Sequence, residues 1–108
     1  MKRYILAIAL ILSVASLAIA GGYEALTVAN TSIGFTAATY GRARSALCRL
    51  ETGPIRYTID GTTVPTDAIG IPVYPGEWII LESADQIKNF RGFRSTATSG
   101  SLKCFFID

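Results

Sequence analysis

The sequence predicts an all-β protein, a single antiparallel β-sandwich (immunoglobulin-like or jelly-roll-like) of about eight short strands with one short helical turn. Apolar and polar residues alternate in stretches such as 55–59, which is the period of a half-buried strand. Turn-forming pairs such as Asp60-Gly61 and Pro75-Gly76 separate these stretches. After residue 22, no long stretch shows the 3.6-residue period of an amphipathic helix, and no segment repeats.

The first twenty residues have the organisation of a signal peptide. Lys2 and Arg3 precede an apolar run, and Ala18-Ile19-Ala20 forms a small-x-small cleavage site before Gly21. The alternative is a retained membrane anchor, because the 17 residues from 4 to 20 reach the short limit for a membrane-spanning helix. We therefore expect a signal peptide or anchor over 1–20 and a β-sandwich domain over 22–108.

Charge argues against a nucleic-acid partner. The chain carries ten Lys and Arg against eight Asp and Glu, and two of the ten are Lys2 and Arg3. The remaining domain is therefore balanced, whereas a protein that neutralises phosphates needs an excess of basic residues. Contact with a membrane is expected only if residues 1–20 are retained.

The strands follow one another along the domain between turn signals. They are expected over residues 23–28, 33–37, 45–52, 55–59, 71–74, 77–82, 90–96 and 101–107. Asp60-Gly61 predicts a tight hairpin turn, because such turns need φ > 0. Residues 61–70, rich in Thr, Pro and Asp, are expected to form a loop before the next strand. Ser83 and Gln86 match a capping box, which predicts a helical turn over 84–89.

Cys48 and Cys104 are expected to form a disulfide. Export leads to an oxidising compartment, where an even number of cysteines in a small domain usually pairs. Both fall on strand faces that read as inward, Cys48 beside Leu50 and Cys104 beside Phe106. Closing this loop would stabilise the fold by roughly 4 kcal/mol on chain-entropy grounds. The alternative is a pair of buried free thiols.

Four large apolar residues fall on outward strand positions: Trp78, Ile80, Phe105 and Ile107. Because the outer face of an antiparallel sandwich is normally polar, they predict an interface for self-association or docking. The strand 101–107 is expected at a sheet edge, where Lys103 is its only charged residue to discourage pairing with another chain. The alternative is that one of the four packs beneath the loop 61–70.

Catalysis finds little support in the residues. The chain contains no histidine, and its serines lack a triad partner or a nucleophile elbow. Carboxylates such as Glu51 and Asp60 read as solvated groups on strand edges. We expect no enzyme, no catalytic residue and no cofactor.

Two further patterns have ordinary explanations. Asp60, Thr62 and Asp67 carry oxygen ligands, but the Asp-Gly turn accounts for them, so a cation in this loop stays an open alternative. The segment 90–94 interleaves Phe90 and Phe93 with arginines, a pattern suited to stacking on a base or a sugar, but ordinary strand alternation with both phenylalanines partly buried is the favoured explanation.

From Leu50 to Phe106 the chain resembles a group of small β proteins found among phage and prophage structural genes. The matching segments are 55–62 (Ile-Arg-Tyr-Thr-Ile-Asp-Gly-Thr), Pro65-Thr66, Gly76-Glu77, 89–91 (Asn-Phe-Arg) and 98–100 (Thr-Ser-Gly). The resemblance implies a virion component. Thr63-Val64 makes the turn one residue longer than in that group, and a signal peptide is unusual for proteins that assemble in the cytosol.

A shorter segment, 55–66, is similar to the immunoglobulin-like modules appended to bacterial chitobiases and surface proteins. This second resemblance implies the same architecture, a β-sandwich without catalytic residues.

The function expected from these observations is structural. We predict a non-enzymatic assembly protein, such as a virion decoration or spike-like subunit, that associates with itself or docks on a capsid or surface lattice. The alternative is a secreted or periplasmic binding module that recognises a glycan or a partner protein. Both hypotheses place it in the periplasm, at the cell surface, outside the cell or on a virion.

Overall fold

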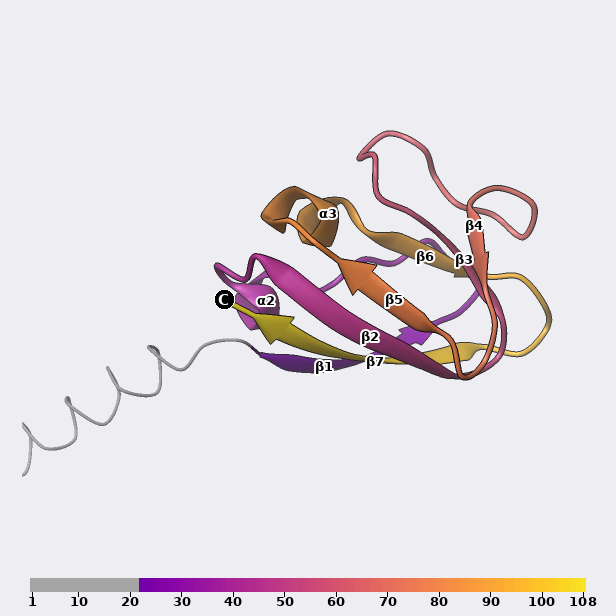
Figure 1. The fold of residues 1–108 in the computed structure, drawn as a ribbon. Helices are drawn as coiled ribbons and strands as arrows, with labels where there is room; N and C mark the ends of the chain where they lie inside the picture. The colour runs from indigo at the N-terminus through magenta and orange to yellow at the C-terminus, as the bar shows by residue number, and fades with distance from the viewer. Residues whose placement is uncertain (1–21) are drawn as a thin grey trace, which may run out of the picture.

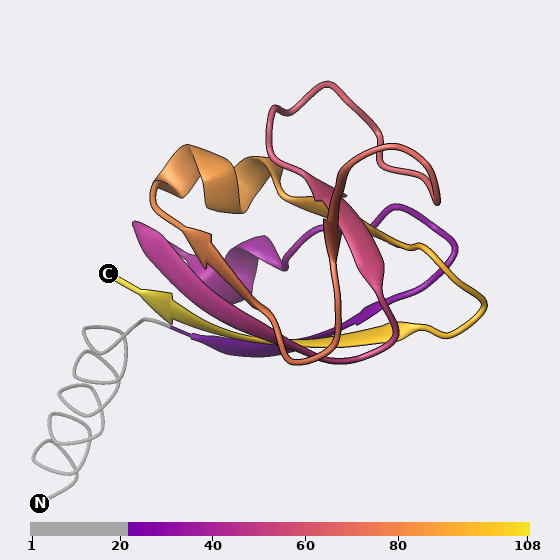
Figure 2. The same cartoon turned by 45° about the vertical axis from the view of Figure 1, so that its right-hand side comes forward.

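The computed structural model describes residues 22–108, so the predicted signal peptide or anchor over 1–20 lies outside the described residues. Two antiparallel sheets pack face to face, with two short helices at one end, and the predicted all-β sandwich is confirmed (Figure 1). Figure 2 shows both helices at the end of the sandwich where the chain terminates. Neither of these helices is long and apolar enough to cross a membrane.

Seven strands and two helices make up the described chain. In chain order they are β1 (Tyr23–Val28), α2 (Ala37–Tyr40), β2 (Ser45–Thr52), β3 (Ile55–Thr58), β4 (Ile71–Val73), β5 (Trp78–Leu81), α3 (Ala84–Asn89), β6 (Arg91–Arg94) and β7 (Gly100–Ile107).

The strands are shared between two sheets. We call the four-stranded one sheet A, with the order β1-β7-β2-β5, and the three-stranded one sheet B, with the order β4-β3-β6. The prediction that the last strand lies at an edge is wrong, because β7 pairs on one side with β1 and on the other with β2. The backbone groups of β7 are therefore used within the sheet, and β1 and β5 form the edges of sheet A.

Alternation along the strands builds the core. In β7, for example, Leu102, Cys104 and Phe106 point inward and are buried. Aromatic rings from distant segments meet in the core, where Phe90 stacks on Phe35 (centroids 4.5 Å apart) and on Tyr57 (5.6 Å). Such ring pairs add to the stability that comes from burying apolar area.

Helix α3 begins and ends as predicted. Ser83 has extended backbone and its Oγ accepts a hydrogen bond from Gln86 N (3.2 Å), as an N-cap does. The return bond of the capping box is shifted by one residue, because Gln86 Oε1 accepts from Glu82 N (2.8 Å). Ile87 fixes the helix by burying its side chain in the core.

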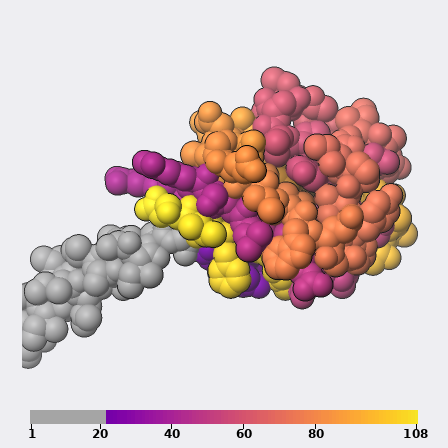
Figure 3. Space-filling model, in the orientation of Figure 1, coloured from indigo at the N-terminus to yellow at the C-terminus, as the bar shows by residue number. Residues whose placement is uncertain are grey.

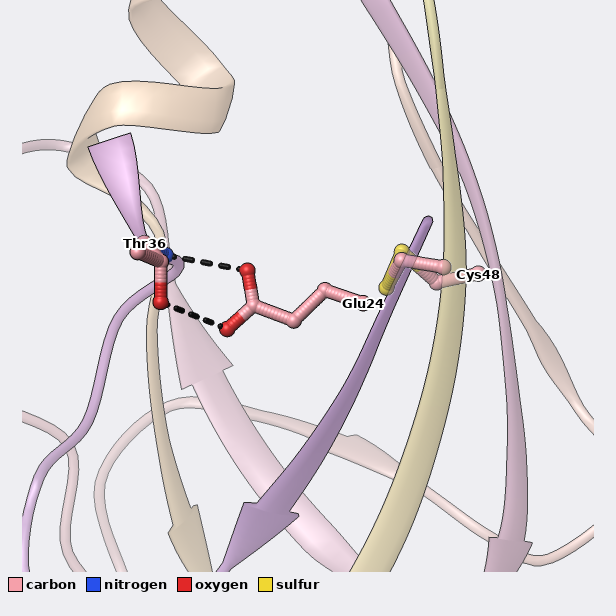
Figure 4. Close-up of a disulfide and its surroundings, with 4 residues drawn as sticks. Glu24, Thr36 and Cys48 are labelled. Atoms are coloured by element: carbon pink, nitrogen blue, oxygen red, sulfur yellow. Dashed lines mark hydrogen bonds between the residues drawn. A yellow bond between two sulfur atoms is a disulfide. The ribbon is translucent and has the colours of Figure 1, made fainter. Parts of the chain in front are cut away.

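The strand predicted over 33–37 does not form. Ile33 makes a single bridge to Gly92, and the chain then turns into α2. Glu24, which points inward from β1, accepts hydrogen bonds from Thr36 N and Thr36 Oγ1, both 3.0 Å long (Figure 4). This carboxylate satisfies the first turn of α2 from outside the helix, a contact that the local sequence does not reveal.

The tight hairpin turn predicted at Asp60-Gly61 is also wrong. Within residues 22–108, only glycines have positive φ, so Asp60 does not adopt the turn conformation that the prediction requires. β3 and β4 pair as antiparallel neighbours, but a long loop over residues 59–70 joins them. Asp60 instead binds the backbone of Thr62 and Thr63 with its own carboxylate.

The predicted disulfide is present. Cys48 on β2 and Cys104 on β7 are directly paired in register, with their Cα atoms 4.1 Å apart (Figure 4). Both are fully buried, and the bridge joins neighbouring strands of sheet A. A disulfide is compatible with an exported protein.

Candidate functional site: the outer face of sheet A

The outer face of sheet A exposes six large apolar side chains with exposed fractions between 37% and 63%. They are Tyr23, Leu47, Trp78, Ile80, Phe105 and Ile107. We call this set the apolar face. In the space-filling view, side chains of β7 (yellow), β2 (magenta) and β5 (orange) lie next to one another on this side (Figure 3).

Four of these residues form one row across the whole sheet. Tyr23 on β1 pairs with Phe105 on β7, Phe105 pairs with Leu47 on β2, and Leu47 pairs with Ile80 on β5. The rings of Tyr23 and Phe105 are 5.0 Å apart. Because paired residues on one face of a sheet have adjacent side chains, the row is continuous.

The next row along the strands contains two basic residues. It contains Ala25, Lys103, Arg49 and Trp78 in the same strand order. The Arg49 guanidinium carbon lies 5.4 Å from the ring centroid of Trp78, which is cation–π geometry. Lys103 Nζ lies 3.9 Å from a carboxylate oxygen of Glu51. The apolar row therefore has a border of both charge signs on one side.

The apolar face is comparable in size to the largest apolar patch of a typical soluble monomer, which is often functional. The three aromatic side chains, each about half exposed, present about 300 Å² together, and the aliphatic ones bring the total to roughly 500 Å². Contiguous patches of this size usually mark an interaction site.

The sequence identified four of the six residues. The structure places Trp78, Ile80, Phe105 and Ile107 on the same exposed face, and none of them packs beneath the loop 61–70. Tyr23 and Leu47 were missed. Their outward positions could have been read from the alternation of β1 and β2, but their adjacency to Phe105 depends on strand order.

The disulfide lies on the inner side of sheet A, opposite the apolar face. Cys48 follows Leu47 and Cys104 precedes Phe105, so the covalent bridge lies directly under the centre of the row. The bridge thus holds Leu47 and Phe105 in register.

The opposite side of the sandwich carries the loop 59–70, which is tied down by side chains. Arg56 donates from Nε to Asp67 O (3.1 Å) and from Nη1 to Gly70 O (2.9 Å). The Asp60 carboxylate accepts from Thr63 Oγ1 (2.5 Å) and from the backbone N–H groups of Thr63 and Thr62. These bonds, led by the Thr63 hydroxyl, lower the pKa of Asp60 from 3.8 to about 2.

The loop does not bring the possible cation ligands Asp60 and Asp67 together. Asp60 lines a surface hollow of about 240 Å³, and Asp67 lines a different one of about 410 Å³. Across residues 22–108, no group of three or more His, Cys, Asp or Glu side chains is placed to hold a metal ion.

Residues 90–94, the segment considered for stacking on a base or a sugar, follow ordinary strand alternation only in part. Phe90 is fully buried in the core, whereas Phe93 is half-buried on the outer side of β6. Phe93 lines the larger hollow together with Arg94.

Comparison with known proteins gives no relative, because no family model, no curated protein and no solved structure matches the chain.

Proposed function

We propose that this protein is a non-catalytic assembly protein that associates with further copies of itself, or docks on a lattice, through the apolar face. The observation that carries the proposal is the continuous row of Tyr23, Phe105, Leu47 and Ile80 across all four strands of sheet A. A row of this kind, left in water, forgoes the stabilisation that burial gives to apolar area.

The composition of the face also favours a protein partner. Aromatic residues are enriched at protein interfaces, and an arginine held over a tryptophan is a frequent anchor. The domain after residue 20 has eight Lys and Arg and eight Asp and Glu, so like charge does not keep copies apart.

The small area of the apolar face favours a weak or transient association. Two faces of roughly 500 Å² bury about 1,000 Å² in total, which is at the lower limit of specific interfaces. We therefore expect a weak dimer, with a dissociation constant on the order of micromolar. Repeated copies on a lattice would raise the effective concentration and make such a contact sufficient.

The resemblance to small β proteins of phage structural genes favours a virion decoration or spike-like subunit as the setting. This assignment predicts that the gene lies among capsid and portal genes and that the mature protein occurs in purified particles. Neighbouring genes for secretion or polysaccharide synthesis would contradict it, and so would particles that lack the protein by mass spectrometry.

Self-association is tested by measuring mass in solution over a range of protein concentrations. The wild-type domain should form dimers or larger species, and the double variant Phe105→Lys with Trp78→Ser should stay monomeric with an unchanged circular dichroism spectrum. A wild-type domain that is monomeric at the highest concentration would rule out self-association.

A matched control is available on the other side of the molecule. Val64 and Tyr74 are 63% and 56% exposed, close to Phe105 (60%) and Trp78 (55%), but they lie on the loop 59–70 and just after β4. The variant Val64→Lys with Tyr74→Ser should associate like the wild type. Loss of association in this control would show that added charge, rather than the apolar face, is responsible.

A further inference from the structure

A second site lies on the outer side of sheet B. The hollow of about 410 Å³ is lined by Asn30, Asp67, Phe93, Arg94 and the residues 95–97. We call it the sheet B groove. Its walls come from three separate parts of the chain.

The loop segment that carries Asp67 is held in place by Arg56, which lies beside Phe93 on sheet B. Arg56 and Phe93 are register partners on the outer face of sheet B, since their neighbours Ile55 and Gly92 are buried. Arg56 Nε donates to Asp67 O (3.1 Å), which holds the loop at Asp67 over this part of the sheet. Arg56 is therefore a positioning residue for Asp67.

The wall that carries Asn30 is fixed through the backbone. Arg94 N donates to Ala29 O (2.9 Å), which ties the segment after β1 to the end of β6. On the third wall, Ser95 N donates to Pro54 O (3.0 Å) and Thr98 N donates to Thr96 Oγ1 (3.3 Å). A groove whose walls are held before a ligand arrives loses little conformational entropy on binding.

The chemistry of the lining is specific. Asn30 and Asp67 each carry a planar group that can make two parallel hydrogen bonds, and Phe93 supplies an aromatic ring. The side chain of Arg94 is not counted with them, because Arg94 pairs with buried Ile55 and follows Phe93 in β6, which puts it on the other face of the sheet. Among residues 22–108, no hydrogen bond or ion pair engages the side chains of Asn30 and Asp67, so they are available to a ligand. The one carboxylate of this pair disfavours a phosphate or another anionic ligand.

A saccharide matches this set. Neighbouring hydroxyls on a sugar ring donate to and accept from planar side-chain groups in pairs, and the apolar C–H face of the ring packs on an aromatic side chain. We infer that the sheet B groove binds a neutral saccharide of a few rings, with Asn30 and Asp67 on its hydroxyls and Phe93 against its C–H face. This site is independent of the assembly proposed above, because it lies on the other sheet.

The test is a titration of the ¹⁵N-labelled domain, followed by amide chemical shifts. The probes are neutral di- to tetrasaccharides of glucose, galactose, mannose or N-acetylglucosamine, added to about 10 mM. At least one probe should shift the amides of residues 30, 67 and 93–97 and leave those of sheet A unchanged. Absence of shifts with every probe, or shifts confined to the apolar face, would overturn the inference.

Variants then identify the contacts. Asp67→Ala and Phe93→Leu should each raise the dissociation constant about tenfold or more, because one removes a hydrogen-bonding group and the other the ring. Asp67 is exposed, so its variant should fold normally. Asp85→Ala, an exposed acid on α3, is the control and should bind like the wild type. Unchanged binding by Asp67→Ala would refute the assignment of the site.

Discussion

Gly53 illustrates how closely the backbone packs where the chain crosses from β2 to β3. Its φ is +54°, and a Cβ atom there would meet Ser99 O at 2.5 Å and Thr98 O at 2.6 Å. Gly41 has nearly the same φ, +50°, but a Cβ atom would meet nothing within 4 Å. The two positions therefore separate backbone strain from crowding.

Alanine substitution at these two glycines should differ in cost. Gly41→Ala should lower the free energy of unfolding by about 1 kcal/mol, the cost of left-handed backbone for an L residue. Gly53→Ala should lower it by about 2 kcal/mol more, because carbonyl oxygens cannot move aside. Urea unfolding of both variants measures the difference. Equal losses of unfolding free energy would show that the loop before β7 shifts easily to make room for the added Cβ atom.

Asp60 makes stability depend on pH in the acid range. Its folded-state pKa of about 2 lies below the ordinary 3.8, so the ionised carboxylate contributes stability above about pH 4. That contribution is lost as the pH falls through the folded-state pKa. Asp60→Asn does not titrate, so the wild type should have the higher melting temperature at pH 6, and the gap should close towards pH 2.

A second variant checks the cause of the lowered pKa. Thr63→Val removes the hydroxyl that donates to Asp60 Oδ2, so the pKa of Asp60 should rise towards its ordinary value. A carboxyl titration followed by NMR measures it directly. An unchanged pKa in Thr63→Val would assign the effect to the backbone N–H groups instead.

At the scale of elements, the pairing of β2 with β7 holds sheet A together. The two strands are the central pair of the sheet, and the Cys48–Cys104 bridge crosses them over a sequence separation of 56 residues. Such a bridge lowers the entropy of the unfolded chain more than that of the folded one.

Removing the bridge should destabilise the domain without changing its fold. The double variant Cys48→Ala with Cys104→Ala should lose roughly 4 kcal/mol of unfolding free energy, measured in urea. Reduction of the wild type should produce a similar loss, which controls for the missing sulfur atoms. Alkylation of two thiols in unreduced, denatured protein from its native compartment would contradict the bridge itself.

At the scale of the whole molecule, the apolar face and the sheet B groove lie on opposite sides of the sandwich. The apolar face belongs to sheet A, and the groove lies on the outer side of sheet B. A copy docked through sheet A would present the groove to the solvent. The two proposals are therefore compatible in one particle, and each can fail without the other.

The driving force of assembly gives a prediction about salt. The apolar row, rather than its charged border, should carry the contact, because exposed charges are screened and contribute little. The dissociation constant should change by less than about threefold between 0.05 and 0.5 M NaCl, and the heat capacity of association should be negative. Sedimentation and calorimetry measure both. A steep salt dependence would assign the contact to Arg49 and Lys103.

Local sequence patterns were sufficient to predict the features that depend on neighbours along the chain. The period of two in β2 and β7 placed Cys48 and Cys104 inward and Phe105 and Ile107 outward. The capping pair Ser83 and Gln86 fixed the start of α3. These are local properties, because a strand face or a helix cap is set by residues a few positions apart.

Which distant segments contact one another became visible only in the folded chain. Strand order placed β7 inside the sheet and brought Tyr23 and Leu47 beside Phe105. Glu24 binds Thr36, the residue before α2, from 12 positions away, and Arg56 holds the loop 59–70 through the carbonyl oxygen of Asp67. Pairing and packing join residues far apart in the chain, and no local pattern encodes their partners.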